Sequence, residues 1–460
     1  MSTQIHSNAS RAVAHATATP GRLLAPAFAA AGLLWACGYV ALTAPGQAIG
    51  EALFAAMAVS VALGGAASVV LGASCGSSAA SAGARTGALV GVINLLIVGS
   101  LAPRNADGQV EWLMLGVWAA GMLVGCAVLG AIGGVLVPAP RQGSRAWMDP
   151  TALFAAVSAA LIFGMLVTGG IVTGEESGLA VPDWPNSFGH NMILLPLSAM
   201  KADHGVFYEH AHRLSGMLVG LTSIALVIQA FRSGQRAAVR NLAVLAVALV
   251  CVQGLLGGLR VTGELTLSQD RAQLAPSTAM AIVHGVNGQV VFAIFCVIAA
   301  MTSRAWNQLG AEQVARSTMG TRIPTIGLVV VLLQVTLGAI YRHVQVVNPE
   351  TLVPSGVKWA LHAHLGVALL ALAAMVMVGI KAMRDGACVR AVKRAGMSIH
   401  ALLLIQIVLG TLALVAVMMR KSGSIPAWEV AVTTAHQVCG AAIVAAMALV
   451  LAWALRMRRG

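Results

Sequence analysis

Twelve apolar runs recur along the chain, and each approaches the length that a helix needs to cross a membrane. Such a helix needs about 20 predominantly apolar residues. Of the 460 residues, 58% are hydrophobic and only 9% are charged, whereas a soluble domain carries roughly 25% charged residues. The sequence therefore predicts an all-α polytopic membrane protein with about 12 transmembrane helices.

The charged residues indicate how these helices are oriented. The net charge of +13 does not point to nucleic acid, because the Lys and Arg residues lie in short segments between the apolar runs. If the N-terminus is cytoplasmic, most cations fall on the inner side and most acids on the outer side, as the positive-inside rule requires. We therefore expect a multi-pass protein of the cell inner membrane, with both termini cytoplasmic and no nucleic-acid partner.

The last eight apolar runs form two similar halves. Gln253-x-x-x-Gly in the first half recurs as Gln406-x-x-x-Gly in the second, and Thr168-Gly-Gly matches Thr336-Leu-Gly. All four spans of each half return in the same order, which indicates parallel repeats related by an axis along the membrane normal. We predict that these eight helices form two pseudo-symmetric four-helix bundles.

The repeat divides the chain into four predicted regions. They are a polar N-terminal tail (residues 1–21), an accessory four-helix membrane region (22–145), a first four-helix half (151–305) and a second four-helix half (320–456). The accessory region lacks the repeat and is rich in Ala, Gly and Ser. Close packing between helix backbones explains these small residues without any further function.

Four helices of the repeat carry a histidine at a similar depth below the outer surface, namely His212, His284, His364 and His436. Metal-binding side chains inside a membrane are costly and usually mark function. A hydrogen bond between helices would explain one such histidine. It does not explain why the interval from His212 to His284 equals that from His364 to His436. Since two imidazoles from facing helices can hold one iron axially, we predict one haem within each half.

His210 and His362 leave the choice of ligand open at two positions. Each lies two residues before a candidate ligand and therefore on a different helix face. The equal intervals favour His364, whereas the recurring His-x-x-x-Gly spacing favours His362, which Gly366 follows. Where that glycine occurs, we expect it to leave room for a large flat macrocycle on the same helix face.

Charged residues accompany the first of these histidines. Glu209 lies one turn before His212, so both side chains can face one pocket. Its carboxylate is a candidate to accept protons or to stabilise a cationic intermediate, and an ion pair with Arg213 is the structural alternative. Arg213 and Arg260 are candidates to bind haem propionates, because Arg binds carboxylates with two parallel hydrogen bonds. Arg260 would alternatively extend to the membrane surface.

Two segments of this sequence resemble the haem A synthase family, cysteine-free type. The first reads Thr168-Gly-Gly-Ile-Val-Thr-Gly and continues, after one residue, as Glu176-Ser-Gly-Leu-Ala-Val-Pro-Asp-Trp-Pro. It is similar to the first span and outer loop of that family. The second, Glu209-His-Ala-His-Arg, is similar to its Glu-x-x-His-Arg element. Together with the remaining histidines, the resemblance extends over about residues 151–455.

The resemblance implies an oxidoreductase that converts the C8 methyl group of haem O to the formyl group of haem A for terminal oxidases. Water would supply the oxygen, and an external acceptor would take the electrons. The implied catalytic residues are Glu209, His212 and His284, around the substrate haem in the first half. His364 and His436 would bind a haem b cofactor, Arg213 would assist cofactor binding, and all four histidines would be iron ligands.

The resemblance also implies partners and leaves alternatives. Haem O synthase and cytochrome oxidase assembly factors are the implied protein partners, membrane lipid surrounds the chain, and a homo-oligomer is left open. The first outer loop holds no cysteine, and residues 1–145 lie outside the family pattern. A di-haem membrane cytochrome for electron transfer, or a haem transporter, would use the same histidines. The di-haem cytochrome gives no role to Glu209 or to the long loop 174–205.

Overall fold

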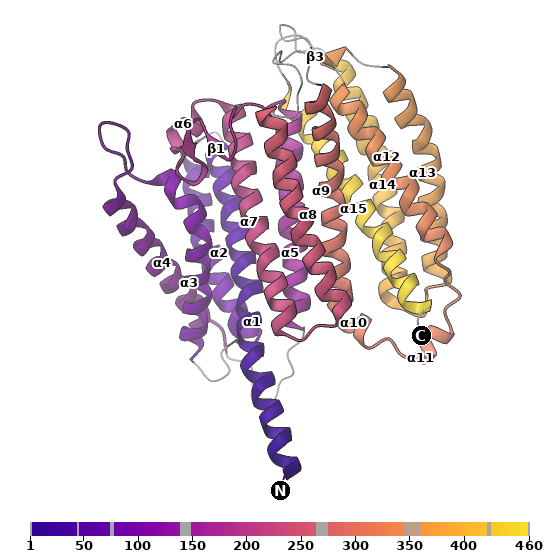
Figure 1. The fold of residues 1–460 in the computed structure, drawn as a ribbon, viewed down its shortest axis with the longest axis horizontal. Coiled ribbons are helices and arrows are strands. Elements are labelled where there is room, and N and C mark those ends of the chain that lie inside the picture. Colours follow the sequence, from indigo (N-terminus) through magenta and orange to yellow (C-terminus); the bar gives the residue numbers. More distant parts are fainter. Residues whose placement is uncertain are drawn as a thin grey trace. The chain divides into compact units, whose positions relative to one another are not determined.

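The computed structural model describes residues 2–43, 46–73, 78–138, 149–263, 275–344, 346–347, 354–355, 358–420 and 425–458. In this part of the chain, twelve helices are long and apolar enough to cross a membrane (Figure 1). The strands that it contains are only two residues long. The predicted class, an all-α polytopic membrane protein, is therefore confirmed.

The twelve long helices are α1 (Ser2–Thr43), α2 (Gln47–Val70), α3 (Ala79–Val98), α4 (Trp112–Val135), α5 (Pro150–Gly174), α7 (His204–Arg232), α8 (Ala237–Thr262), α9 (Ala275–Thr302), α12 (Arg322–Val344), α13 (Lys358–Arg384), α14 (Arg390–Met419) and α15 (Ala427–Arg458). The polar N-terminal tail belongs to α1, whose apolar span begins at Gly21.

The shorter elements are the 3-10 helices η1 (Gly99–Leu101) and η2 (Met192–Leu194), the helices α6 (Leu197–Lys201), α10 (Arg304–Asn307) and α11 (Ala311–Ala315), and the strands β1 (Asn186–Ser187), β2 (His190–Asn191), β3 (Val346–Val347) and β4 (Pro354–Ser355). Strands β1 and β2 pair with each other, as do β3 and β4.

The chain separates into two compact units. Unit 1 comprises Met1–Leu161, His190–Asp203 and Arg213–Ala243, and unit 2 comprises Ile162–Gly189, His204–His212 and Val244–Gly460. Both units therefore include parts of α5, α7 and α8. All four candidate histidines belong to unit 2.

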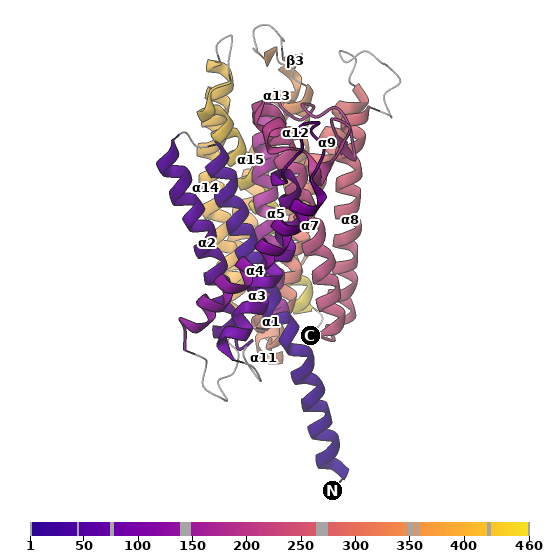
Figure 2. The same ribbon diagram turned by 90° about the vertical axis from the view of Figure 1, so that its left-hand side faces the viewer.

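Small residues hold the helices of unit 1 together. Helix α3 packs along α4, and the two are seen from the side in Figure 2. A Cβ atom on Gly83 or Gly130 would collide with the backbone of the facing helix, and one on Gly87 would collide with the carbonyl of Cys126. Close approach of backbones between small residues is the usual mode of helix association in membranes. Close packing therefore explains Gly83, Gly87 and Gly130.

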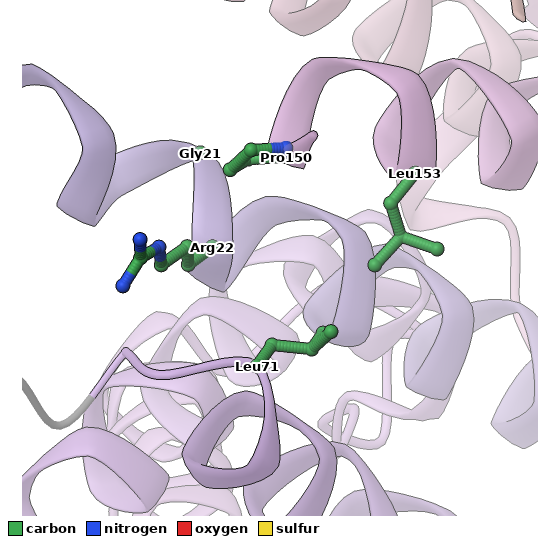
Figure 3. Close-up of a pocket in the computed structure, with 5 residues that line it drawn as sticks. All are labelled: Gly21, Arg22, Leu71, Pro150 and Leu153. Atoms are coloured by element: carbon green, nitrogen blue, oxygen red, sulfur yellow. The ribbon is translucent and has the colours of Figure 1, made fainter. Parts of the chain in front are cut away.

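One small pocket lies in unit 1 (Figure 3). Its lining residues are Gly21, Arg22, Leu71, Pro150 and Leu153. The cavity has a volume of about 10 Å³, which is room for about one water molecule. This pocket is therefore too small for an organic ligand.

Unit 2 is built from neighbouring antiparallel helices. Helix α12 packs against α13, α13 against α14, and α14 against α15, while α9 contacts both α12 and α15. The last turns of α5 lie on α15, where a Cβ on Gly170 would come 2.7 Å from the methyl group of Thr434. The rings of Trp306 and Trp453 lie 4.7 Å apart. The pseudo-symmetry of the two halves stays a prediction.

Candidate functional site

The structure places the four candidate histidines in two facing pairs. His212 of α7 and His284 of α9 have ring centroids 6.5 Å apart and an angle of 69° between their planes. For His364 of α13 and His436 of α15 the distance is again 6.5 Å, and the angle is 79°. Each histidine lies within the first ten residues of its helix. Both pairs thus have the same separation and nearly the same ring orientation.

The separation within each pair suits one metal ion between the rings. An imidazole nitrogen binds a first-row metal ion at about 2.0–2.1 Å. The ring centre lies about 1.2 Å behind that nitrogen, because ring C–N bonds are near 1.33 Å. Two imidazoles on opposite sides of one ion therefore have ring centres about 6.4 Å apart.

The number of side chains in each pair suits haem better than a bare ion. Among the residues that the structure describes, no three His, Cys, Asp or Glu side chains cluster in a way that could hold a metal ion. Haem needs only axial ligands from the protein, since the porphyrin supplies four nitrogens in its plane. Two facing histidines are therefore a sufficient donor set for one haem.

Each of the four rings lies on a glycine of a neighbouring helix. The pairs are Gly169–His212, Gly257–His284, Gly338–His364 and Gly410–His436, and the nearest ring atom is Cε1 in every pair. A Cβ on any of these glycines would lie 2.9–3.2 Å from that atom, which is closer than carbon atoms normally approach. Gly169 is therefore the counterpart of Gly338, although the Thr-x-Gly spacing in the sequence suggests Gly170.

The glycine four residues after a histidine does not face open space in two of the helices. A Cβ on Gly288 would lie 3.2 Å from the side-chain nitrogen of Gln253, and one on Gly440 would lie 3.7 Å from that of Gln406. The room expected there for a macrocycle is thus taken by an amide. The contacts within each helix pair are reciprocal. The histidine of one helix packs against a glycine of its neighbour, and the glutamine of that neighbour packs against a glycine of the first helix.

Gln334 is a further member of this arrangement, which the sequence reasoning missed. Its side-chain nitrogen lies 3.1 Å from Nδ1 of His364. The signal was present in the spacing, because Gln334 precedes Gly338 by four residues, as Gln253 and Gln406 precede their glycines. The repeated Gln-x-x-x-Gly spacing therefore marks the helix that packs against a candidate ligand.

The two neighbouring histidines take other positions. His362 is exposed on α13, whereas His364 faces His436, which favours His364 as the candidate ligand. His210 is fully buried, and its Nδ1 lies 3.2 Å from the hydroxyl of Ser187. His210 therefore contacts the segment that follows α5, on a different face of α7 from His212.

This segment, residues 175–189, also covers Glu209 and Arg260. The backbone N–H of Val181 donates a hydrogen bond of 2.8 Å to Oε2 of Glu209, whose side chain is buried. Gly178 lies on the guanidinium of Arg260, where a Cβ would come 2.8 Å from both terminal nitrogens. The buried carboxylate of Glu209 thus lies one helical turn from His212 and accepts a hydrogen bond from the loop.

The arginines predicted to bind propionates differ in their surroundings. Arg260 lies under the loop and close enough to Glu209 for electrostatic interaction, so it does not simply extend to the surface. Arg213 is partly buried and follows His212 directly, about 100° around the helix. Propionate binding by either residue stays a prediction.

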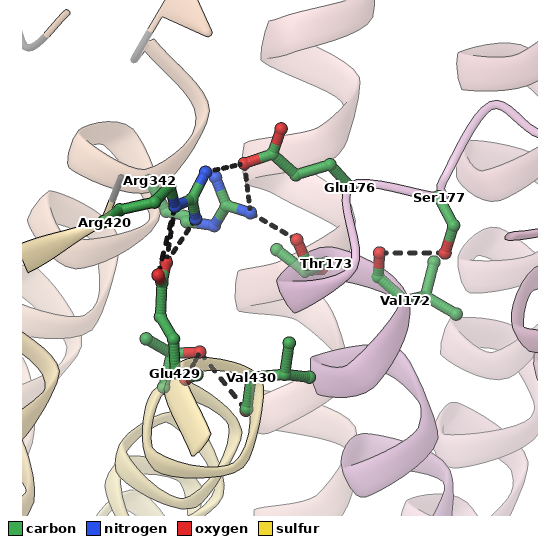
Figure 4. Close-up of polar contacts among 9 residues, drawn as sticks. Val172, Thr173, Glu176, Ser177, Arg342, Arg420, Glu429 and Val430 are labelled. Carbon is green, nitrogen blue, oxygen red and sulfur yellow. Dashed lines mark hydrogen bonds and ion pairs between the residues drawn. The ribbon is translucent and has the colours of Figure 1, made fainter. Parts of the chain in front are cut away.

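Four charged side chains meet where α5, α12 and α14 end and α15 begins (Figure 4). Nε of Arg420 lies 3.0 and 3.1 Å from the two carboxylate oxygens of Glu429, and Nη1 lies 2.8 Å from Glu176. Arg342 lies 3.6 Å from Glu176 and donates a hydrogen bond to the carbonyl of Thr173. We call Glu176, Arg342, Arg420 and Glu429 the charge cluster.

The charge cluster is largely withdrawn from solvent. The side chains of Arg420 and Glu429 are only 3% and 2% exposed. Burial alone lowers the pKa of the Arg420 guanidinium, but the hydrogen bonds that it donates to Glu429 and Glu176 outweigh burial and raise the pKa above its ordinary value. In the sequence these residues are single charges at helix ends, and their pairing depends on which helices meet.

The backbone at Glu176 explains how this side chain reaches the cluster. Its φ of 55° is left-handed, and the end of α5 has hydrogen bonds from Glu176 to Thr173 and from Ser177 to Val172. Glycine is the usual residue at this position of such a helix end. A glutamate there costs about 1–2 kcal/mol, and its ion pair with Arg420 gives a reason for keeping it.

The glycines beneath the rings lead to a testable expectation. Replacing Gly338 by Ala pushes the ring of His364, because the new Cβ would lie 2.9 Å from Cε1. We expect haem affinity of the second half to fall about tenfold, the lower end for groups that orient metal ligands. Titration of haem into the purified protein measures this.

Gly366 provides the matched control on the helix of His364 itself. A Cβ there would meet nothing within 4 Å, so Gly366→Ala should keep haem affinity and raise thermal stability slightly, as Ala does in helices. Equal haem affinity in Gly338→Ala and Gly366→Ala would contradict a role for the Gly338 contact.

Comparison with known families supplies independent information. The sequence model of a family described as cytochrome oxidase assembly protein, COX15-CtaA, matches residues 152–448. That range contains both histidine pairs, the loop over Glu209 and the charge cluster, and it excludes helices α1–α4. Comparison with individual curated proteins gives no match.

Proposed function

The chain belongs to the COX15-CtaA family of cytochrome oxidase assembly proteins, and on that premise we propose that it is a haem A synthase. In the proposed reaction the C8 methyl group of haem O takes one oxygen atom from water and becomes the formyl group of haem A. Four electrons pass to an external acceptor and four protons are released. The protein thereby supplies haem A for a terminal oxidase.

The observation that carries this proposal is the equal geometry of the two histidine pairs. Both pairs have a centroid distance of 6.5 Å, which suits one iron in each. A protein with two such sites can hold a substrate haem and a cofactor haem at the same time. His212 and His284 are the proposed ligands of haem O, and His364 and His436 are the proposed ligands of haem b.

Glu209 supports the assignment of the substrate to the first half. Oxidation of a methyl group releases protons, and a buried carboxylate one turn from His212 is suited to accept one. The N–H of Val181 holds Oε2 of Glu209, and this carboxylate is the proposed proton acceptor. The loop over Glu209 limits access of bulk water to this end of α7. When bound, haem b supplies one-electron transfer.

The proposal also covers the location of the protein and its binding partners. It lies in the cell inner membrane with both termini cytoplasmic, and it receives haem O from haem O synthase. Arg213 and Arg260 are the proposed partners of haem propionates in the first half. Cytochrome oxidase assembly factors take the product.

Pigment analysis tests the proposal directly. The full chain is purified from cells that make haem O, and the pigments are extracted and separated. We expect haem b together with haem O or haem A, and conversion of added haem O to haem A with a suitable electron acceptor. A preparation that contains haem b alone, and that does not convert haem O, would contradict the proposal.

Glu209→Gln gives a sharper test of the site. This change keeps the shape of the side chain and removes its ability to accept a proton. We expect conversion of haem O to fall about 100-fold or more, while haem b content is unchanged. Glu312→Gln, at an exposed acid of α11, is the control and should keep full conversion.

The alternatives predict other results in these experiments. A di-haem membrane cytochrome would hold haem in both pairs and keep electron transfer in Glu209→Gln. A haem transporter would lose haem on dilution of the purified protein. Either result, without conversion of haem O in the unaltered protein, would overturn the proposed function.

A further inference from the structure

The nitrogen atoms of the histidines point to a role for side chains behind them. An imidazole that binds iron through Nε2 keeps its proton on Nδ1, and this N–H needs an acceptor that fixes the ring and its tautomer. The acceptor also influences how strongly the imidazole donates to the metal. The groups at Nδ1 of His212, His284 and His364 therefore matter for any haem in these sites.

In the first half, both acceptors are evident. Oγ1 of Thr168 lies 3.0 Å from Nδ1 of His212. That hydroxyl donates its own hydrogen to the carbonyl of Met165 at 2.9 Å, so its oxygen accepts from the ring. Nδ1 of His284 lies 3.1 Å from the backbone carbonyl of Gln253, which can only accept. These contacts suit rings that carry the proton on Nδ1 and leave Nε2 for a metal.

In the second half, the group behind His364 is a side-chain amide. The nitrogen of Gln334 lies 3.1 Å from Nδ1 and 3.4 Å from Nε2 of His364. Oε1 of Gln334 is buried and has no hydrogen-bond partner among the described residues. If His364 carries its proton on Nδ1, two donors would face each other while an acceptor is left unused.

A half-turn of the Gln334 amide removes both problems. The two ends of an amide are nearly equal in shape, and their assignment follows from hydrogen bonding. After the turn, Oε1 accepts from Nδ1 of His364, and a buried polar atom gains its partner. We propose that Gln334 is a positioning residue. Its side-chain oxygen accepts a hydrogen bond from the Nδ1–H group of His364 and thereby influences the reduction potential and the affinity of the haem in the second half.

Gln253 shows that this role does not follow from the spacing alone. Its side-chain nitrogen donates to the carbonyl of His284 at 2.8 Å, and its Oε1 accepts from Asn287 at 2.7 Å. The Gln253 side chain thus joins helices α8 and α9 without serving the ring of His284. Side-chain changes at Gln253 and Gln334 should therefore have different effects.

The inference rests on the proposed role of His364 as a haem ligand, and it is tested by redox titration of the purified holoprotein. The relevant haem is the one that His364→Ala removes. Gln334→Leu takes away the acceptor, so the imidazole donates less electron density. We expect the reduction potential of this haem to become more positive and its affinity to fall about 10–100-fold.

Gln334→Glu should act in the opposite direction. A carboxylate is a stronger acceptor than an amide, so we expect haem to be retained with a more negative potential than in the unaltered protein. A residue that only fills space would not give shifts of opposite sign. This variant also keeps the test decisive if Gln334→Leu binds too little haem to titrate.

Gln253→Leu is the control in the first half, at a glutamine that also precedes a ring-contacting glycine by four residues. Since the acceptor for His284 is a backbone carbonyl, this variant should keep the potentials of both haems. Unchanged potential and affinity in both Gln334 variants, in a protein that binds two haems, would overturn this inference and leave the proposed function standing. A protein that binds no haem would instead remove the proposed function itself.

Discussion

Replacing Arg420 by Gln should lower the free energy of unfolding by about 3–5 kcal/mol. Arg420 holds the buried carboxylate of Glu429 through both oxygens and also contacts Glu176. Without the guanidinium, two carboxylates stay in a largely buried place, and Arg342 is the one cation of the charge cluster that is left. Removing one partner of a buried pair is costly because the other charge is left uncompensated. Unfolding of the purified protein in detergent, followed by circular dichroism, measures the loss.

Arg316 provides the control for this experiment. It forms an ion pair of 2.6 Å with Glu312 on α11, and the two side chains are 71% and 77% exposed. Exposed pairs contribute at most about 1 kcal/mol, so Arg316→Gln should change stability little. A loss in Arg420→Gln no larger than that in Arg316→Gln would show that the charge cluster does not stabilise the helix ends.

Under the proposed function, replacing His364 by Ala should remove one of the two proposed haems. An axial ligand contributes a direct bond to the iron, so its loss should cost more than the roughly 10–100-fold in affinity that an outer group costs. The ring of His436 then has no opposing imidazole at 6.5 Å. We expect the haem content per protein to fall by half and the spectrum of the second site to disappear.

His362→Ala is the control that separates the two candidate ligands of α13. His362 is exposed, so its replacement should keep both haems and both spectra. The reverse result, with haem lost in His362→Ala and kept in His364→Ala, would show that the other face of α13 carries the ligand. Haem content by pyridine haemochrome assay, normalised to protein, gives the comparison.

The charge cluster and the histidine pairs are connected through the helices that carry them. Arg342 follows Gly338 by four residues on α12, so it lies one turn beyond the glycine that supports His364. Glu429 lies two turns before His436 on α15. The buried ion pairs therefore hold the same helices that present the second pair, and a loss of the cluster should loosen the geometry of that pair as well.

The amino-acid sequence by itself determined the class of the protein and the set of candidate ligands. Apolar runs long enough to cross a membrane leave the backbone little choice but helix, since lipid offers no hydrogen bonds. The equal intervals between His212 and His284 and between His364 and His436 indicated which histidines belong together. These features depend on distance along the chain, which a single sequence reports directly.

Only the tertiary structure decided what lies across from each side chain. Whether Gln334 contacts His364 depends on how α12 and α13 are rotated against each other, and an apolar helix carries no periodic signal that fixes this rotation in a membrane. Arg420 and Glu176 are far apart in sequence, and their ion pair exists because the ends of α5 and α14 meet. Contacts between helices follow from packing in three dimensions, and hydropathy along the chain does not encode them.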